Sequence, residues 1–192
     1  MTLVANTTPE ANCFDAARIE SVFNTAFSQF NTVLSGGASE PLYSPATSTE
    51  THHTLSYRED FFASALHESA HWCIAGEARR QQQDFGYWYS PDGRNPEQQK
   101  AFEAVEVKPQ ALEWFFSQAC AYPFSISLDN LGQSDSTMPD SSDFKAHVIA
   151  QAKAWQRDGL PARGQILFTA LSAEFATAIK VQDCQFLLEV VA

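Results

Sequence analysis

The chain of 192 residues has the length of one domain, and its 44% hydrophobic residues provide ample material for a core. It carries 12 lysine and arginine residues against 23 aspartate and glutamate residues, which gives a formal net charge of -11. Such a surface repels phosphate backbones and anionic lipid headgroups, so nucleic acids and membranes are not expected partners.

The cysteines show no CxxC or CxxxC spacing, which argues against a disulfide scaffold and against a cysteine-rich zinc site. They are Cys13, Cys73, Cys120 and Cys184. The first residues, MTLVANTTPEANCF, lack the basic stretch and the sustained apolar stretch of a signal peptide. No apolar run reaches the roughly 18 residues needed to cross a bilayer. We therefore expect a cytoplasmic protein with free thiols.

The N-terminal part of the chain predicts a flexible tip, a helix and short strands. Residues 1–12 are interpreted as the tip of a single domain that spans 13–192. Apolar residues recur at helical spacing over 14–34, before a pair of glycines stops the pattern. The segment 40–60 alternates and carries two prolines, which favours short strands joined by a polar loop.

The rest of the chain is predicted to be mostly helical. A helix is expected over about 60–82, followed by an aromatic hairpin or packed loop over 84–94. Asn95 and Pro96 suit the cap and first turn of another helix, which Pro109 would kink or restart. A polar loop is expected over 129–143, and two further helices are expected over 143–158 and 164–180. The predicted fold class is α+β, a helix-dominated single domain with a small β-sheet.

The segment FFASALHESAHWCIAG, residues 61–76, contains an HExxH motif. His67 and His71 are four residues apart, so on a helix their side chains share one face, with Cβ atoms about 6 Å apart. Two imidazoles at that spacing can close on one metal ion. Glu68 lies about 100° around the helix from His67, at the border of the metal face, where a zinc hydrolase has its general base. The motif predicts a metal site on a helix, in a zincin-like arrangement.

The alternative is that both histidines are ordinary residues of an amphipathic helix. The surroundings weigh against it, because small residues dominate this helix and would let a second element approach the histidine face closely. These residues are Ala63, Ser64, Ala65, Ser69, Ala70, Ala75 and Gly76. A chance HExxH in a chain of this composition is also rare, about one in a hundred or below.

A third ligand is expected from the segment FEAVEVKPQALEWFF, residues 102–116, because two histidines alone do not complete a metal site. Glu106 is flanked by Val105 and Val107, an apolar setting in which a buried carboxylate is costly unless a metal pairs with it. Glu106 is therefore the predicted ligand, and Glu103 is the fallback. The other carboxylates considered are Glu113, Asp84 and Asp92. The alternative interpretation is that the glutamates of this segment lie on a solvent-exposed face of the helix and bind no metal.

Three blocks, HESAHWCIAGEARR, DFGYWYSPDGR and FEAVEVKPQALEWFF, closely resemble the bacterial elongation factor P hydroxylases in this order and spacing. Those enzymes act third in the lysine-modification pathway of that factor. The resemblance is densest from Phe61 to about Leu131 and extends more weakly over about 14–161. Departures include Ser90 and the polar stretch around 133–143, and neither is given a role.

The resemblance implies hydroxylation of a lysine side chain that already bears a β-lysyl extension. It also implies a 2-His-1-carboxylate site formed by His67, His71 and Glu106. Such a site with open positions suits non-haem Fe(II) and dioxygen, with zinc as the alternative metal. Glu68 would then orient a ligand histidine instead of acting as a base. No flavin or nicotinamide fingerprint identifies a co-reductant in the sequence.

Two other classes of function stay open at this point. The first is an HExxH zinc peptidase or amidohydrolase with Glu68 as general base. A Glu68→Gln change should abolish hydrolysis by such an enzyme, whereas it should only weaken hydroxylation. The second is a catalytically inert module that clamps the modified factor. Metal analysis combined with oxygen uptake separates a hydroxylase from a hydrolase.

The implied protein substrate, elongation factor P, would need two kinds of contact. Tyr87 and Trp88 would wall a channel for the cationic extended lysine, or else belong to ordinary aromatic packing. Arg79 and Arg80 would form a basic rim that offsets the repulsion between two acidic proteins. The alternative is that these arginines cap the preceding helix or pair with a nearby aspartate such as Asp84.

Overall fold

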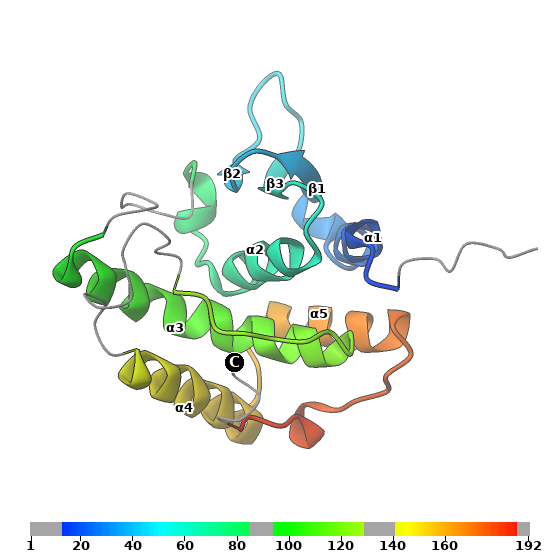
Figure 1. Ribbon diagram of the computed structural model, residues 1–192. Helices are drawn as coiled ribbons and strands as arrows, with labels where there is room; N and C mark the ends of the chain where they lie inside the picture. The colour runs from blue at the N-terminus through cyan, green and yellow to red at the C-terminus, as the bar shows by residue number, and fades with distance from the viewer. Residues whose placement is uncertain (1–12, 85–93, 129–140, 188–192) are drawn as a thin grey trace, which may run out of the picture.

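A computed structural model describes residues 13–84, 94–128 and 141–187. In these three stretches the chain forms five α-helices and one three-stranded sheet. Figure 1 shows the sheet above the second helix, with the third and fourth helices on the other side of it. The predicted helix-dominated fold with a small sheet is therefore confirmed. The predicted tip, residues 1–12, lies outside the described residues.

The sheet consists of β1 (Thr32–Ala38), β2 (Leu42–Ser44) and β3 (His53–Arg58), with β3 in the centre. β1 pairs with β3 in parallel, and β2 pairs with β3 in the antiparallel direction. Helix α1 (Ala16–Ala26) precedes β1. Because β1 and β3 are parallel, the chain must return from the end of β1 to the start of β3, and β2 lies in this connection. Inward residues such as Leu55 belong to the hydrophobic core that the sheet shares with the helices.

The helix predicted over 14–34 is wrong in its second half. α1 ends at Ala26, and a short 3-10 turn follows at Ser28–Phe30. Asn31 then adopts a left-handed conformation with φ 51°, and the chain continues as β1. Helix, turn and strand all direct apolar side chains into one core, so their spacing alone does not mark where one element replaces another.

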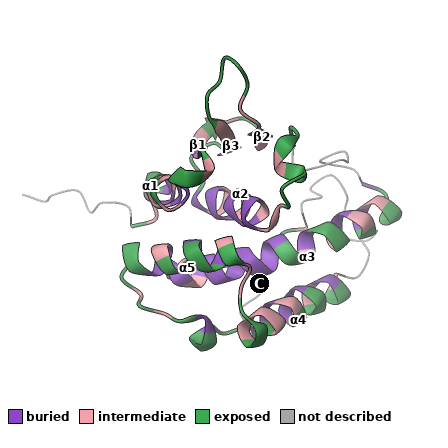
Figure 2. Cartoon of the chain, turned by 180° about the vertical axis from the view of Figure 1, so that it is seen from behind, coloured by how far each residue is buried: buried purple, intermediate pink, exposed green. Residues whose placement is uncertain are grey.

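Helices α2 (Phe62–Ile74) and α3 (Pro96–Ala119) occupy the centre of the molecule, and Figure 2 shows much of both buried. A capping box begins α3. The Asn95 side chain accepts a hydrogen bond from the backbone N–H of Gln98, and the Gln98 side chain accepts one from that of Asn95. The helix continues through Pro109 and does not restart there.

The helix predicted over 60–82 ends earlier, at Ile74. The segment that follows, EARRQQ, has no apolar face to keep a helix against the core, and it forms only a 3-10 turn at Arg79–Gln81. Helix α4 (Ser142–Asp158) lies at its predicted position, whereas α5 (Ala162–Glu174) ends six residues before the predicted end at 180. In the described stretches, no helix is both long and apolar enough to cross a membrane.

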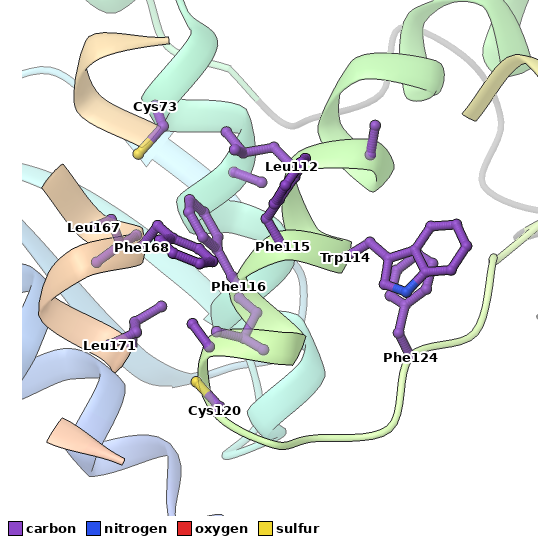
Figure 3. Close-up of a cluster of buried hydrophobic side chains, with 14 of the residues drawn as sticks. Cys73, Leu112, Trp114, Phe115, Phe116, Cys120, Phe124, Leu167, Phe168 and Leu171 are labelled. Atoms are coloured by element: carbon purple, nitrogen blue, oxygen red, sulfur yellow. The ribbon is translucent and has the colours of Figure 1, made fainter. Parts of the chain in front are cut away.

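A dense aromatic core lies along α3 and holds it in place (Figure 3). The buried side chains there come from α3 and α5, and they include Leu112, Phe115, Phe116, Leu167, Phe168 and Leu171. Trp114 stacks on Phe124 with ring centroids 5.0 Å apart. Interiors packed at this density resist displacement. The polar residues that α3 directs toward α2 are thus carried by a firmly held helix.

Candidate metal centre

His67 and His71 of α2 and Glu106 of α3 form a cluster whose ligand atoms all lie within 4.8 Å of one another. The Nε2 atoms of the two histidines are 3.1 Å apart. Glu106 places Oε1 3.2 Å from Nε2 of His71 and Oε2 3.5 Å from Nε2 of His67. The two helices lie side by side in both views (Figures 1 and 2). The structure thus brings the three predicted ligands together.

Small residues on α2 leave room for α3. Ala65, Ser69 and Ala70 are fully buried. The Ser69 hydroxyl donates to the backbone carbonyl of Ala65 over 2.7 Å, so its polar group is satisfied within its own helix. A helix surface without bulky side chains permits a short distance between helix axes, and imidazoles from one helix then reach a carboxylate on the other.

The donor set fits a divalent cation. Glu106 has 0% exposure, and its buried Oε1 accepts no hydrogen bond among the described residues. Burial of a carboxylate oxygen without a hydrogen bond is costly, although Nε2 of His71 lies 3.2 Å away. Two imidazole nitrogens that face each other at 3.1 Å also need a shared proton or cation between them. A metal ion held by two imidazoles and one carboxylate satisfies both requirements.

Charges within the cluster shift two pKa values. Burial would raise the pKa of Glu106, but the positive charges of His71 and His67 outweigh it and lower the pKa to about 2. Burial would lower the pKa of His67, but the negative charge of Glu113 and its hydrogen bond, with a smaller effect of Glu106, raise the pKa to about 10. Without a metal, a proton on His67 therefore balances the ionised Glu106.

Glu113 orients His67 through the other ring nitrogen. Its Oε2 lies 2.8 Å from Nδ1 of His67. When Nδ1–H donates to this carboxylate, Nε2 is the atom left to bind a metal, and the ring is fixed in direction. Glu113 follows Glu106 by seven residues, which is two helical turns, so one helix supplies both a ligand and the group that orients a second ligand.

Gln110 lies between these two glutamates on the same face of α3. Its amide nitrogen donates to the backbone carbonyl of Ser127 over 2.8 Å, and its amide oxygen accepts from the backbone N–H of Ser127 over 3.0 Å. The same nitrogen lies 3.5 Å from Oε2 of Glu106. The extended segment around Ser127 thus fixes Gln110, and Gln110 in turn limits the rotation of the Glu106 carboxylate.

The fallback ligands lie outside the cluster. Glu103 accepts a hydrogen bond from Gln99 over 3.1 Å, one helical turn before Glu106. Asp84 forms an ion pair with Arg79, with 2.6 Å between Nε and the carboxylate oxygen. Asp92 lies outside the described residues. Within the described stretches, Glu106 is the carboxylate that meets both histidines.

The residues predicted to contact the substrate are placed only in part. Tyr87 and Trp88 lie outside the described residues. Arg80 donates to the backbone carbonyl of Ala75 over 2.8 Å, at the end of α2, a contact that matches the helix-capping alternative. The ion pair of Arg79 described above matches the aspartate-pairing alternative. A docking role for the two arginines stays a prediction.

A pocket of about 400 Å³ opens beside the cluster. His71 and Glu68 form part of its wall, and Arg79 and Arg80 lie along another part. The remaining wall is mostly apolar and aromatic, with Tyr43, Trp72 and Phe102 among its residues. Such a volume with a few polar groups is typical of a site for a small molecule or a side chain.

Glu68 differs from the other glutamates of the site. It is 6% exposed, and burial raises the pKa of its carboxyl against the opposing effect of His71 and His67. In the part of the chain that the structure describes, it forms no hydrogen bond to either histidine, whereas Glu113 does. The contact that orients a ligand histidine therefore comes from Glu113.

The comparison with known proteins agrees with this geometry. A family model described as elongation factor P hydroxylase matches residues 22–186. The chain is 42% identical over 169 residues to the elongation factor P lysine hydroxylase of Haemophilus influenzae, an alignment that covers 88% of this chain and 93% of that relative. This chain belongs to the elongation factor P hydroxylase family. The resemblance found in the sequence is confirmed, and the chain is a hydroxylase by family.

Two supporting residues of this hydroxylase were not assigned their roles by the sequence analysis. Glu113 was considered only as a possible ligand, and Gln110 was given no role. The signal was present in the spacing, because residues 106, 110 and 113 recur at i, i+4 and i+7. Polar residues with that recurrence in an otherwise apolar helix indicate a buried polar face.

Above the pKa of His67, where no proton competes with the metal, replacement of Glu113 by alanine should weaken metal binding by about 10- to 100-fold. The reason is that His67 then loses the acceptor that fixes its Nδ1–H. The measurement is a competition titration of the metal against a chelator. Glu113→Gln keeps an oxygen that accepts the hydrogen bond from His67, so this variant should lose less metal affinity than Glu113→Ala. An unchanged affinity in Glu113→Ala would mean that His67 is oriented by another group.

Metal binding should release about one proton at neutral pH. His67, with a pKa of about 10, is protonated in the metal-free protein, and the metal replaces that proton. Glu106, with a pKa of about 2, is already ionised and contributes none. The apparent affinity should therefore rise by about tenfold per pH unit below pH 10. Calorimetry in buffers of different ionisation enthalpy measures the released proton.

Glu113→Ala is the control for this pH dependence. Glu113 raises the pKa of His67, so without this carboxylate fewer protons should be released on metal binding at pH 8. The apparent metal affinity should then vary less with pH. The affinity difference between parent and variant should therefore widen as the pH rises. A parent protein that binds metal without release of a proton at pH 8 contradicts the protonated state of His67.

Proposed function

We propose that this protein hydroxylates the β-lysylated lysine side chain of elongation factor P, with Fe(II) held by His67, His71 and Glu106 and with dioxygen as co-substrate. The observation that carries the proposal is the His-His-Glu cluster, whose ligand atoms lie within 4.8 Å, in a chain of the elongation factor P hydroxylase family. Two imidazoles and one carboxylate with open positions are the ligand set of non-haem iron oxygenases. Zinc is the alternative metal.

The protein's own residues prepare this site. Glu113 orients His67, and Gln110 limits the rotation of Glu106, so the ligands are held in place by their supporting hydrogen bonds. When bound, iron supplies the activation of dioxygen that attack on an unactivated C–H bond requires. The apolar wall of the pocket beside His71 keeps water from the reacting carbon.

The pocket beside His71 is the proposed place of the modified lysine. Its volume of about 400 Å³ lies in the range of sites that enclose small ligands. The methylene groups of the extended side chain would pack on the apolar wall, to which Trp72 and Phe102 contribute. Tyr87 and Trp88 stay predicted as further parts of the channel.

A zinc peptidase or amidohydrolase is the alternative function. The HExxH motif lies on α2, and Glu68 borders the metal face there, as the general base does in a zincin-like arrangement. The raised pKa of Glu68 suits a base. Membership of a hydroxylase family favours oxygen insertion over hydrolysis.

The setting of the enzyme follows from its substrate. We infer a cytoplasmic location, where an elongation factor acts, and one working domain over 13–192. Arg79 and Arg80 are the proposed docking residues, since both line the pocket. They would offset the repulsion between an acidic partner and a chain whose net charge as a whole is -11.

Mass spectrometry tests the proposed function. Elongation factor P with the β-lysyl extension, incubated with this protein, Fe(II), a chemical reductant and dioxygen, should gain one oxygen atom on the modified lysine. His67→Ala and His71→Ala should each lose the bound metal and this gain, while far-UV circular dichroism stays unchanged, because the helix does not need imidazoles for its packing.

His147→Ala is the matched control, since His147 lies exposed on α4 and its loss should leave metal content and product unchanged. Cleavage of a peptide or amide bond in the factor, without a gain of oxygen, would favour the zinc hydrolase. Full metal content in either cluster variant would contradict the site assignment.

A further inference from the structure

The structure gives partners to two of the three carboxylates around the cluster. Glu106 faces both histidines, and Glu113 binds Nδ1 of His67. The third, Glu68, is 6% exposed and belongs to the wall of the pocket. Within the described residues it takes part in no hydrogen bond and no ion pair. Its oxygens are not among the buried side-chain atoms without a partner, so within the described residues this carboxylate opens onto the pocket, where a ligand can reach it.

The predicted metal ligands do not include this carboxylate. The ligand atoms that converge within 4.8 Å belong to His67, His71 and Glu106, and Glu68 is not among them. Glu68 follows His67 in the chain, so it lies about 100° further around α2 and borders the metal face without lying under it. The same side chain instead shares the pocket wall with His71.

The cationic side chains of the pocket contact other groups. Arg79 pairs with Asp84, with 2.6 Å between the charged atoms. Arg80 donates to the backbone carbonyl of Ala75 and lies about 6 Å from the Trp72 ring. Both arginines have partners other than Glu68. His71 and His67 act on Glu68 only through their charge and form no hydrogen bond to it within the described residues, so a ligand can supply its direct donor.

The pocket defines what kind of cation fits. Its wall is mostly apolar, with Leu55, Trp72, Ile74 and Phe102 among the residues, and it encloses about 400 Å³. An apolar wall suits a chain of methylene groups, and a carboxylate on that wall suits an ammonium group on the chain. A small inorganic cation has no methylene groups and would leave the apolar wall of the pocket exposed to water.

We propose that Glu68 is the residue that binds an ammonium group of the substrate side chain, at the end of the pocket next to the metal cluster. This assignment rests on the proposed function and adds the group that the site recognises. Glu68 and His71 share one wall, so an ammonium held there places the neighbouring carbons of the chain beside the cluster. Glu68 thereby selects a modified lysine that carries an ammonium group over one that carries none.

Binding to the metal-free protein tests this role apart from catalysis. The probes are elongation factor P with β-lysyl-lysine and the same factor with acetyl-lysine at the same position, and calorimetry gives Kd. The parent should bind the β-lysylated factor more tightly than the acetylated factor. Glu68→Gln should weaken binding of the β-lysylated factor by at least about tenfold and leave binding of the acetylated factor unchanged.

Glu103→Gln is the charge-matched control. The replacement removes one negative charge from α3, as Glu68→Gln does from α2, and Glu103 is not part of the pocket wall. It should bind both factors as the parent does. Metal titration of Glu68→Gln should give the parent's metal content, because Glu68 is not a ligand.

Three results would overturn the assignment. They are a parent that does not distinguish the two factors, a Glu68→Gln protein that binds the β-lysylated factor as tightly as the parent, and a Glu68→Gln protein that loses affinity for both factors equally. The oxygen-gain experiment reports on the proposed function separately. A parent that distinguishes the two factors but adds no oxygen would reject the reaction and keep the role of Glu68.

Discussion

Glu106 carries a negative charge into a fully buried position between two histidines of another helix. A charge at such a place is tolerated only with a counter-charge, and either a proton on His67 or a metal supplies it. Neither helix contains the complete set of groups, so the site exists only while α2 and α3 are packed together. Folding of the helix pair and formation of the site are therefore one event.

The remaining architecture serves to keep this pair in register. Phe115 and Phe116 anchor one side of α3 against α5, and the other side presents Glu106, Gln110 and Glu113 to α2. A rotation of α3 about its axis would expose aromatic rings and bury unpaired carboxylates, and both changes cost free energy. The aromatic core thus holds α3 in the orientation that the chemistry requires.

The HExxH spacing in the sequence was enough to predict a helix with both histidines on one face, and the carboxylate chosen over Glu103 is the one that meets both histidines. The apolar neighbours do not explain that choice, because Val105 is 59% exposed and points away from the buried Glu106. The helix over 14–34 was predicted wrongly because the apolar pattern continues through a turn into β1. The contact between Glu113 and His67 could not be predicted, because the two residues are 46 apart in the chain and their contact depends on the register of two separate helices. Periodicity describes a face of one helix and carries no information on the face that it meets.

The two hydrogen bonds between Gln110 and Ser127 have a direction. The N–H of Ser127 requires the amide oxygen, so the amide cannot flip, and its NH₂ group always points toward Glu106. Gln110 therefore offers Glu106 a donor at 3.5 Å, which adds to the larger effects of His71 and His67 in favour of the ionised carboxylate. The backbone of a segment outside the helix pair thus sets the direction of an amide that faces a predicted ligand, and a Gln110→Glu exchange would place a second carboxylate oxygen where that donor lies.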